Sequence, residues 1–290
     1  MEFHYGGQAV IEGVMMRGPT ARAVAVRLAS GKVHVEVTPA RSWLTLKPWY
    51  GWPIIRGLVT LAETLTAGID ALLVSANLSE DPEEHLTRRE TVLAVGLALL
   101  LSVGLFIILP TVLVSFLRGL IAHRFWLNLT EGVVRVSILT LYLVAISRLP
   151  EVQRLLAYHG AEHQAIHAYE NQKSLEPEVV RDFSLKHPRC GTSFLLVVML
   201  VSVILFSFFG WPGIWQRIVL RLVLLPVVAG VSYELIRWAG RSRSPLVQAI
   251  SWPGLMLQRY TTRTPDDSQI EVAAAALQAV LADKKVVQSV

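Results

Sequence analysis

The sequence predicts a mainly α-helical membrane protein with about four transmembrane helices, because its composition is apolar and two long stretches carry no charge. Of the 290 residues, 53% are apolar and 17% are charged, whereas charged residues make up about 25% of a typical soluble domain. No charged residue occurs in Val92–Leu117 or in Thr192–Trp215, and a bilayer core of about 30 Å requires about 20 helical residues. This composition excludes a disordered chain and does not suit a fully soluble globule.

The N-terminal region, residues 1–52, is predicted to contain a small β-hairpin on the cytoplasmic side. Two runs in which apolar and polar residues alternate, Ala23–Leu28 and Lys32–Val37, are joined by Ala29–Gly31. Alternation with a period of two is typical of half-buried strands, and small residues with a glycine favour a tight turn between them.

The glycine-rich segment before this hairpin, Gly6–Gly18, is expected to form loops packed on the membrane face. It lacks the GK[ST] ending of a phosphate-binding P-loop. Its charged residues Glu12 and Arg17 are candidates for a polar site.

Residues 53–78 are predicted to form one helix with a polar stripe. Arg56, Glu63, Asp70 and Asn77 recur every seven residues, and seven residues drift only about 20° around a helix. We expect an interfacial amphipathic helix whose stripe faces water. The alternative is a re-entrant or buried helix in which Glu63 and Asp70 line a cavity.

Four transmembrane segments are expected in the rest of the chain, at residues 92–117, 132–149, 192–214 and 216–236. Arg135 lies near the end of the second segment, and we expect its charge to snorkel to the interface.

The distribution of basic residues predicts that both termini are cytoplasmic, together with the long connection at residues 150–191. Four crossings place these three parts on one side, and the flanks of the spans on that side hold Arg88, Arg89, Arg148, Arg154, Arg237, Arg241 and Arg243. An excess of Lys and Arg marks the cytoplasmic side of a membrane protein.

The C-terminal region, residues 237–290, is predicted to be a cytoplasmic tail with an amphipathic helix. Ile270, Ala274, Leu277 and Leu281 follow the helical period and form one apolar face.

Charged residues precede this helix: Arg259 and Arg263, then Asp266 and Asp267. We expect them to form an internal ion-pair network. Alternatively, the two arginines bind an anionic headgroup or phosphate.

Histidines concentrate in the connection at residues 150–191, which predicts a metal site. His159, His163 and His167 are spaced by four residues on an expected helix, so their rings share one face, and Glu170 returns to within about 20° of His159. Two imidazoles one helical turn apart are common ligands of a divalent metal, most often zinc, with iron as the alternative.

The subsequence from His159 to His163 also fits the H-x-x-E-H pattern of zinc metallopeptidases, in which the glutamate is the general base. Glu162 is therefore the predicted catalytic residue. His167, Glu170, His187 and Cys190 remain open as further ligands. Cys190 is the single cysteine, so the chain cannot form an internal disulfide.

Four motifs together carry a resemblance to a known family: Gly6–Gly18, Tyr158–Glu170, His187–Phe194 and Gln258–Gln269. They resemble the YqhQ-like bacterial membrane proteins of the family called domain of unknown function 1385. The resemblance covers nearly the whole chain. It implies a multi-pass protein of the bacterial cytoplasmic membrane, described as a predicted metal-dependent enzyme of unknown substrate.

The function expected from these observations is metal-dependent hydrolysis at the cytoplasmic face of the bilayer, on a peptide or a lipid-linked substrate. A membrane di-iron oxygenase is an alternative, although such enzymes need more histidines than are clustered here. The non-enzyme alternative is a channel, transporter or scaffold, with a structural or regulatory metal and with Arg135, Arg221 and Glu234 as pathway residues. A channel of this class is compatible with a homo-oligomeric assembly. The basic residues at the cytoplasmic ends of the spans explain the net charge of +5, so no nucleic-acid partner is expected.

Overall fold

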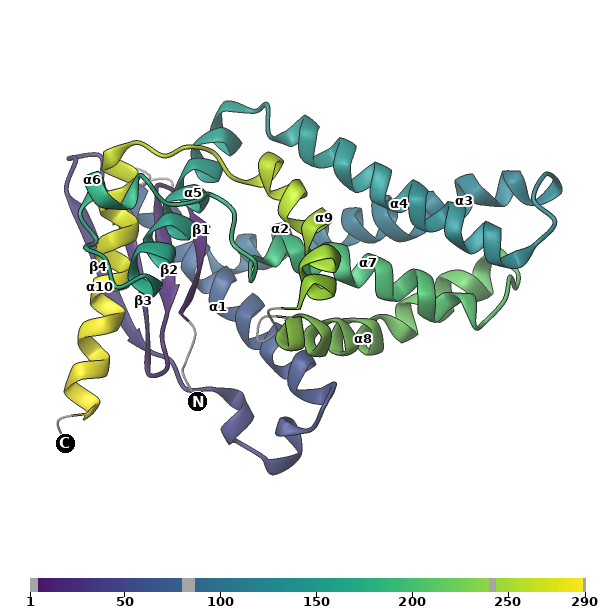
Figure 1. Ribbon diagram of the computed structural model, residues 1–290, viewed down its shortest axis with the longest axis horizontal. Helices are drawn as coiled ribbons and strands as arrows, with labels where there is room; N and C mark the ends of the chain where they lie inside the picture. The colour runs from purple at the N-terminus through teal and green to yellow at the C-terminus, as the bar shows by residue number, and fades with distance from the viewer. Residues whose placement is uncertain (1–4, 80–86, 240–243, 289–290) are drawn as a thin grey trace.

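The computed structural model describes residues 5–79, 87–239 and 244–288, and places a small β-sheet at one end of a helical bundle (Figure 1). The sheet consists of β1 (Gly6–Val10), β2 (Gly13–Arg17), β3 (Ala21–Arg27) and β4 (Val33–Pro39), all antiparallel in the order β1-β2-β3-β4. The expected hairpin is confirmed as β3 and β4.

The segment expected to form loops is instead the hairpin of β1 and β2, in which Val10 pairs with Gly13 across a two-residue turn. Glu12 takes a positive φ of 50° in this turn. Val14, Met15 and Met16 form a continuous apolar run because both faces of β2 are buried, so the strand lacks the alternation that marks a half-buried strand.

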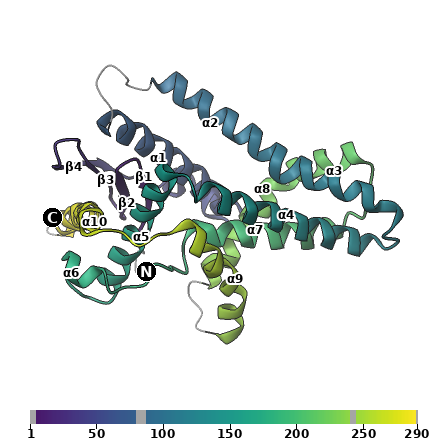
Figure 2. The same ribbon diagram turned by 90° about the horizontal axis from the view of Figure 1, so that it is seen from above.

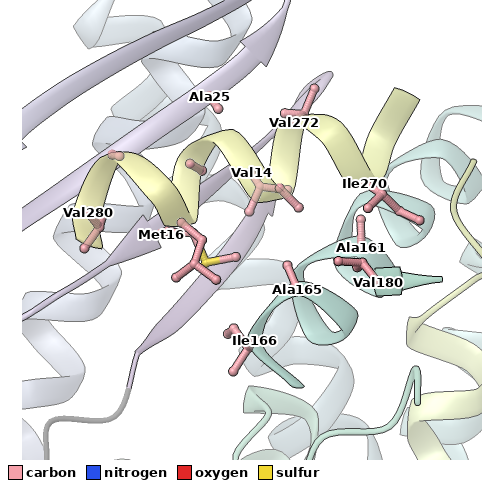
Figure 3. Close-up of a cluster of buried hydrophobic side chains, with 14 of the residues drawn as sticks. Val14, Met16, Ala25, Ala161, Ala165, Ile166, Val180, Ile270, Val272 and Val280 are labelled. Atoms are coloured by element: carbon pink, nitrogen blue, oxygen red, sulfur yellow. The ribbon is translucent and has the colours of Figure 1, made fainter. Parts of the chain in front are cut away.

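Both faces of the sheet are covered. Helix α1 (Ile55–Ser79) packs on one face, where Val10, Met15, Val24 and Val26 meet Ala71. On the other face, α5 (Pro150–Glu170) and α10 (Asp267–Gln288) enclose a second apolar core (Figure 3).

Helix α10 therefore belongs to the core of the sheet region and is not a separate tail. Ile270 and Leu277 are fully buried, as the predicted apolar face requires, and Val280 packs with Met16 in the same core. The C-terminal part of the chain thus returns to cover the N-terminal sheet (Figure 1).

The polar stripe of α1 faces other elements of the fold, and its residues Glu63 and Asp70 line a cavity of about 190 Å³. Glu63 pairs with Arg17 of β2, and Asp70 lies 3.3 Å from the guanidinium of Arg22 of β3. Arg56 pairs with Glu234. The charged residues of α1 all take part in these ion pairs, and its exposed residues, Ala62, Thr64, Leu65 and Thr66, are uncharged.

The helical bundle contains the remaining long helices, with α2 along one edge and α9 along the opposite edge (Figure 2). Its elements are α2 (Arg88–Val103), a π-helical segment η4 (Gly104–Ile108), α3 (Leu109–Ser115), η5 (Phe116–Gly119), α4 (Arg124–Ile146), α7 (Gly191–Ser207), α8 (Ile214–Ala239) and α9 (Pro245–Thr261). Short helices complete the fold: η1 (Trp43–Thr45), η2 (Pro48–Gly51) and α6 (Pro177–Val180).

Among the described residues, four helices are long and apolar enough to cross a membrane: Ile55–Ser79, Arg89–Gly119, Arg124–Ile146 and Ile214–Ala239. This set differs from the expected one at two positions. The expected span at residues 192–214 forms a 17-residue helix that ends at Ser207, before a turn in which Gly210 has a φ of 69°. Helix α1, expected at the interface, meets the criterion instead.

Helix α8 carries independent evidence of a bilayer environment. Trp215 and Trp238 lie near its two ends and are 77% and 53% exposed. The two tryptophans are 23 positions apart, which corresponds to about 35 Å of helix. This is slightly more than the hydrocarbon thickness, and tryptophan is enriched at both membrane interfaces. The apolar helices and this spacing both fit a multi-pass membrane protein.

Candidate metal centre

Helix α5 positions the histidines because its other face is taken by the sheet core. Proline at its first position has the φ that a helix start requires. Tyr158, Ala161 and Ala165 face the core with α10, so the histidines lie toward the segment that precedes α7. His163 is 2% exposed and Glu162 is 5% exposed.

Two of these histidines are oriented by backbone carbonyls. The Nδ1 of His159 lies 2.6 Å from the carbonyl oxygen of Thr261, and the Nδ1 of His163 lies 2.5 Å from that of Leu185. A carbonyl only accepts hydrogen bonds, so each Nδ1 carries the proton and each neutral ring has an unprotonated Nε2. Metal-binding histidines in proteins show this arrangement.

Cys190 lies within reach of both rings. Its Sγ is 3.4 Å from the Nε2 of His159, and one ligand atom from each of His159, His163 and Cys190 falls within 4.8 Å of the others. Cys190 is the N-cap residue of α7. The structure therefore brings together three of the predicted ligands in a group that we call the His–His–Cys trio.

Glu162 lies beside this trio and is not one of the three residues whose ligand atoms converge. Its Oε2 is 3.9 Å from the Nε2 of His159 and 3.6 Å from that of His163. Burial raises the pKa of Glu162, and this increase is partly offset by His159 and by the backbone N–H of Gly7. A carboxyl group with a raised pKa suits a role in proton transfer.

The trio and Glu162 line a cavity of about 90 Å³ that Gly7 of β1 helps to close. A Cβ atom at position 7 would lie 2.8 Å from the Cγ of Glu162 and 2.7 Å from the carbonyl oxygen of Met15. Only glycine therefore lets β1 approach the carboxylate so closely. Sequence reasoning noted this glycine but did not connect it with Glu162.

His167, Glu170 and His187 form a second trio next to the first. One ligand atom from each lies within 4.8 Å of the others, and the rings of His163 and His187 are 5.5 Å apart. His167 Nε2 donates to the carbonyl of Lys186 at 2.9 Å.

Charge compensation makes this second trio the weaker metal candidate. Arg189 pairs with Glu170, and His187 and Arg189 hold the pKa of Glu170 at about 2. Burial lowers the pKa of His187 to about 4, so its ring is neutral at pH 7. Its Nε2 is buried, has no hydrogen-bond partner and lies 3.8 Å from Glu170, beyond hydrogen-bond range. The sequence did not indicate a role for Arg189, because its ion pair with Glu170 of α5 forms only when the loop between them folds back.

Two residues that the sequence did not single out fix the chain segments around the histidines. The side chain of Gln258 accepts a hydrogen bond from the backbone N–H of His187 and donates one to its carbonyl oxygen, both at 2.8 Å. At Gly160, a Cβ atom would lie 2.1 Å from the carbonyl oxygen of Arg263. This close crossing places the carbonyl of Thr261 against His159.

The remaining polar candidates connect elements of the fold and lie outside the two trios. Glu12 pairs with Arg154 of α5 and accepts a hydrogen bond from Tyr158 at 3.3 Å. Arg17, Glu63 and Asp70 join the sheet to α1.

The expected network between two arginines and two aspartates is not the arrangement found. Arg263 donates to the carbonyl of Ser147 at 3.0 Å, and Arg259 is exposed. Asp266 caps α10 by accepting from the N–H of Gln269 at 2.9 Å, and Asp267 pairs with Arg181. The two acids stabilise the start of α10, so they are not available to the arginines.

These features fit a multi-pass helical membrane protein with a buried cluster of histidine, cysteine and carboxylate side chains beside its sheet. The family model described as "Protein of unknown function (DUF1385)" matches residues 52–283, and the chain belongs to this family. The chain is also 32% identical over 292 residues to a Bacillus subtilis (strain 168) protein named "Uncharacterized protein YqhQ", covering 96% of this chain and 92% of the other. No solved structure matches. The predicted family is confirmed, and neither name assigns an activity.

Proposed function

We propose that this protein is a membrane metalloenzyme in which His159, His163 and Cys190 hold one divalent metal, most suitably zinc. The observation that carries the proposal is the orientation of the two imidazoles. Each directs its protonated Nδ1 to a backbone carbonyl, and this leaves two Nε2 atoms and one sulfur as converging donors. Nitrogen and thiolate ligands together favour zinc over magnesium or calcium.

Hydrolysis is the reaction that these residues support best. A zinc ion at such a site would supply Lewis acidity. Glu162 is not one of the three converging donors, and it lines the same cavity. The raised pKa of Glu162 suits a base that takes a proton from water at Oε2 and returns it to a leaving group. Gly7 holds that carboxylate in place through its backbone N–H.

The substrate that we propose is a peptide or lipid-linked molecule that reaches the cavity from the cytoplasmic interface. Cys190 directly precedes α7, so the cavity lies where the sheet region meets the helical bundle. The basic flanks of the spans favour a cytoplasmic position for both termini and for α5. The bacterial cytoplasmic membrane is the proposed location.

The test of catalysis replaces Glu162 with Gln, which keeps the shape of the side chain and removes its ability to take a proton. The protein is reconstituted in bacterial polar lipids, and hydrolysis products of the lipids and of an added peptide library are detected by mass spectrometry. We expect products from the wild type and from the control Glu151→Gln, an exposed change on the same helix, and none from Glu162→Gln at unchanged metal content. Turnover by Glu162→Gln at the wild-type rate would remove Glu162 from this role.

A further inference from the structure

A second cluster of charged side chains lies inside the bundle, at the end away from the sheet. It joins Glu131 and Arg135 of α4 to Arg217 and Arg221 of α8, and these helices extend away from the sheet in Figure 1. Arg135 and Arg221 were expected to snorkel outward or to line a pathway. They are only 7% and 4% exposed, and they turn into the bundle.

One carboxylate serves three guanidinium groups in this cluster. Arg221 Nη2 donates to Glu131 Oε2 at 2.5 Å, and Arg135 Nη2 donates to Glu131 Oε1 at 3.1 Å. Arg217 Nη1 is 3.8 Å from the same carboxylate. Arg135 Nη1 also donates to the hydroxyl oxygen of Ser202 at 3.0 Å, and Arg217 Nη2 donates to that of Ser115 at 2.6 Å.

The cluster is therefore short of negative charge and of hydrogen-bond acceptors. Three arginines and one glutamate leave a net charge of +2, since every ion pair found for these arginines in the described residues leads to Glu131. The Nε of Arg135 and the Nε and Nη1 of Arg217 are buried and have no hydrogen-bond partner. Uncompensated charges inside a membrane protein are costly and mark ligand sites.

Depth along α8 indicates which anion fits. Arg217 follows Trp215 by two residues, about 3 Å of helix, and Arg221 lies about 9 Å from that tryptophan. Exposed tryptophans occupy the level of the lipid headgroups, so the backbone of Arg217 lies near the level of the headgroup phosphates. Guanidinium groups bind phosphate oxygens through paired N–H donors, and the guanidinium of Arg217 is also fixed over the ring of Trp211 at 3.9 Å.

We propose that Arg135, Arg217 and Arg221 bind a phosphate oxyanion at this end of the bundle, with Glu131 holding the guanidinium groups in place. The site is separate from the proposed metal centre and does not depend on it. Phosphate in this position supplies both the missing charge and the missing acceptors. Its source is either the headgroup of a lipid or free inorganic phosphate.

The experiment measures the melting temperature of the detergent-purified full chain in two arms. One arm compares phosphatidic acid with diacylglycerol of the same acyl chains, and the other compares sodium phosphate with sodium chloride at equal ionic strength. The variants are Arg217→Gln and the control Arg118→Gln, which removes an exposed arginine at the same end of the bundle.

We expect phosphatidic acid to raise the melting temperature of the wild type and of Arg118→Gln by about 5 °C at a hundredfold excess over its Kd. Arg217→Gln should show no such shift. A shift with both phosphate probes assigns the site to the free anion as well, and a shift with phosphatidic acid alone assigns it to a lipid headgroup. An unshifted wild type in both arms, or an equal shift in Arg217→Gln, overturns the proposal.

A second variant keeps the test decisive if Arg217→Gln does not fold. Glu131→Gln raises the net charge of the cluster from +2 to +3, so it should lower the concentration of phosphatidic acid that gives half of the shift. An unchanged or increased concentration would overturn the proposal.

Discussion

Gly160 offers a direct test of how the metal centre is assembled, because its replacement by Ala should destabilise the protein although alanine favours helices. A Cβ atom at this position would meet the carbonyl oxygen of Arg263 at 2.1 Å and the Cδ2 of Leu185 at 3.0 Å. The first neighbour is backbone, so the crossing chain must move away from α5.

Three terms set the magnitude of this effect. Overpacking costs about 1–3 kcal/mol. The moving segment also loses two hydrogen bonds, from Arg263 N–H to the carbonyl of Leu156 at 2.9 Å and from His159 to Thr261 at 2.6 Å, each contributing about 1 kcal/mol. The higher helix propensity of alanine returns about 1 kcal/mol. The net loss is about 3 kcal/mol.

Thermal unfolding followed by circular dichroism measures this loss, and we expect the melting temperature to fall by about 6–12 °C. Gly96→Ala is the matched control, since this glycine also lies inside a helix and a Cβ there would meet nothing within 4 Å. The control should be neutral or slightly stabilising. If Gly160→Ala is as stable as Gly96→Ala, the inferred crossing of the chain over α5 is wrong.

Two further predictions concern the segment before α7. Gln258→Leu removes both hydrogen bonds to His187, so it should lower the free energy of unfolding by about 2–4 kcal/mol. It should also weaken zinc binding about 10- to 100-fold. Calorimetric titration with zinc measures this second effect, and an unchanged zinc affinity would contradict the role of Gln258. Acid should also destabilise the protein through His187, because burial depresses its pKa from 6.5 to about 4. The unfolded chain then binds the extra proton between these values, so stability is full above pH 6.5 and falls toward pH 4, by about 2 kcal/mol at pH 5. Denaturant unfolding of metal-free protein at pH 7 and pH 5 measures this loss, and His187→Asn should remove it; an equal loss in that variant would assign the pH dependence to other groups.

Helical spacing was sufficient to place the three histidines of α5 on one face and to predict Glu162 beside them, because these relations are set within two turns of one helix. Local sequence patterns could not show which residues contact that face of α5. His159 is oriented by Thr261, a hundred positions away along the chain. Gly7 reaches Glu162 from β1, and Gln258 reaches His187 from α9, through contacts that arise only after the chain has folded.

The same limit explains the polar stripe of α1 and the buried arginines. A period of seven shows that Glu63 and Asp70 share a face, but it does not reveal that Arg17 and Arg22 will meet them. Arg135 near the end of a span favours snorkelling when considered alone. Its burial depends on Glu131 one turn earlier and on Arg221, which arrives from α8 to share the same carboxylate. The strands β1 and β2 lack an alternating pattern, and their glycines weaken any propensity-based prediction.

The central claim, a metal held by His159, His163 and Cys190, is tested most directly by the metal content of the detergent-purified protein, measured by mass spectrometry without chelators and after adding zinc. The wild type, the second-trio variant His167→Ala and the control His34→Ala, which changes an exposed histidine of β4, should hold about one zinc per chain. His159→Ala, His163→Ala and Cys190→Ser should lose it while circular dichroism shows an intact fold. Equal metal in all six proteins, or none in the wild type, would contradict the metal centre.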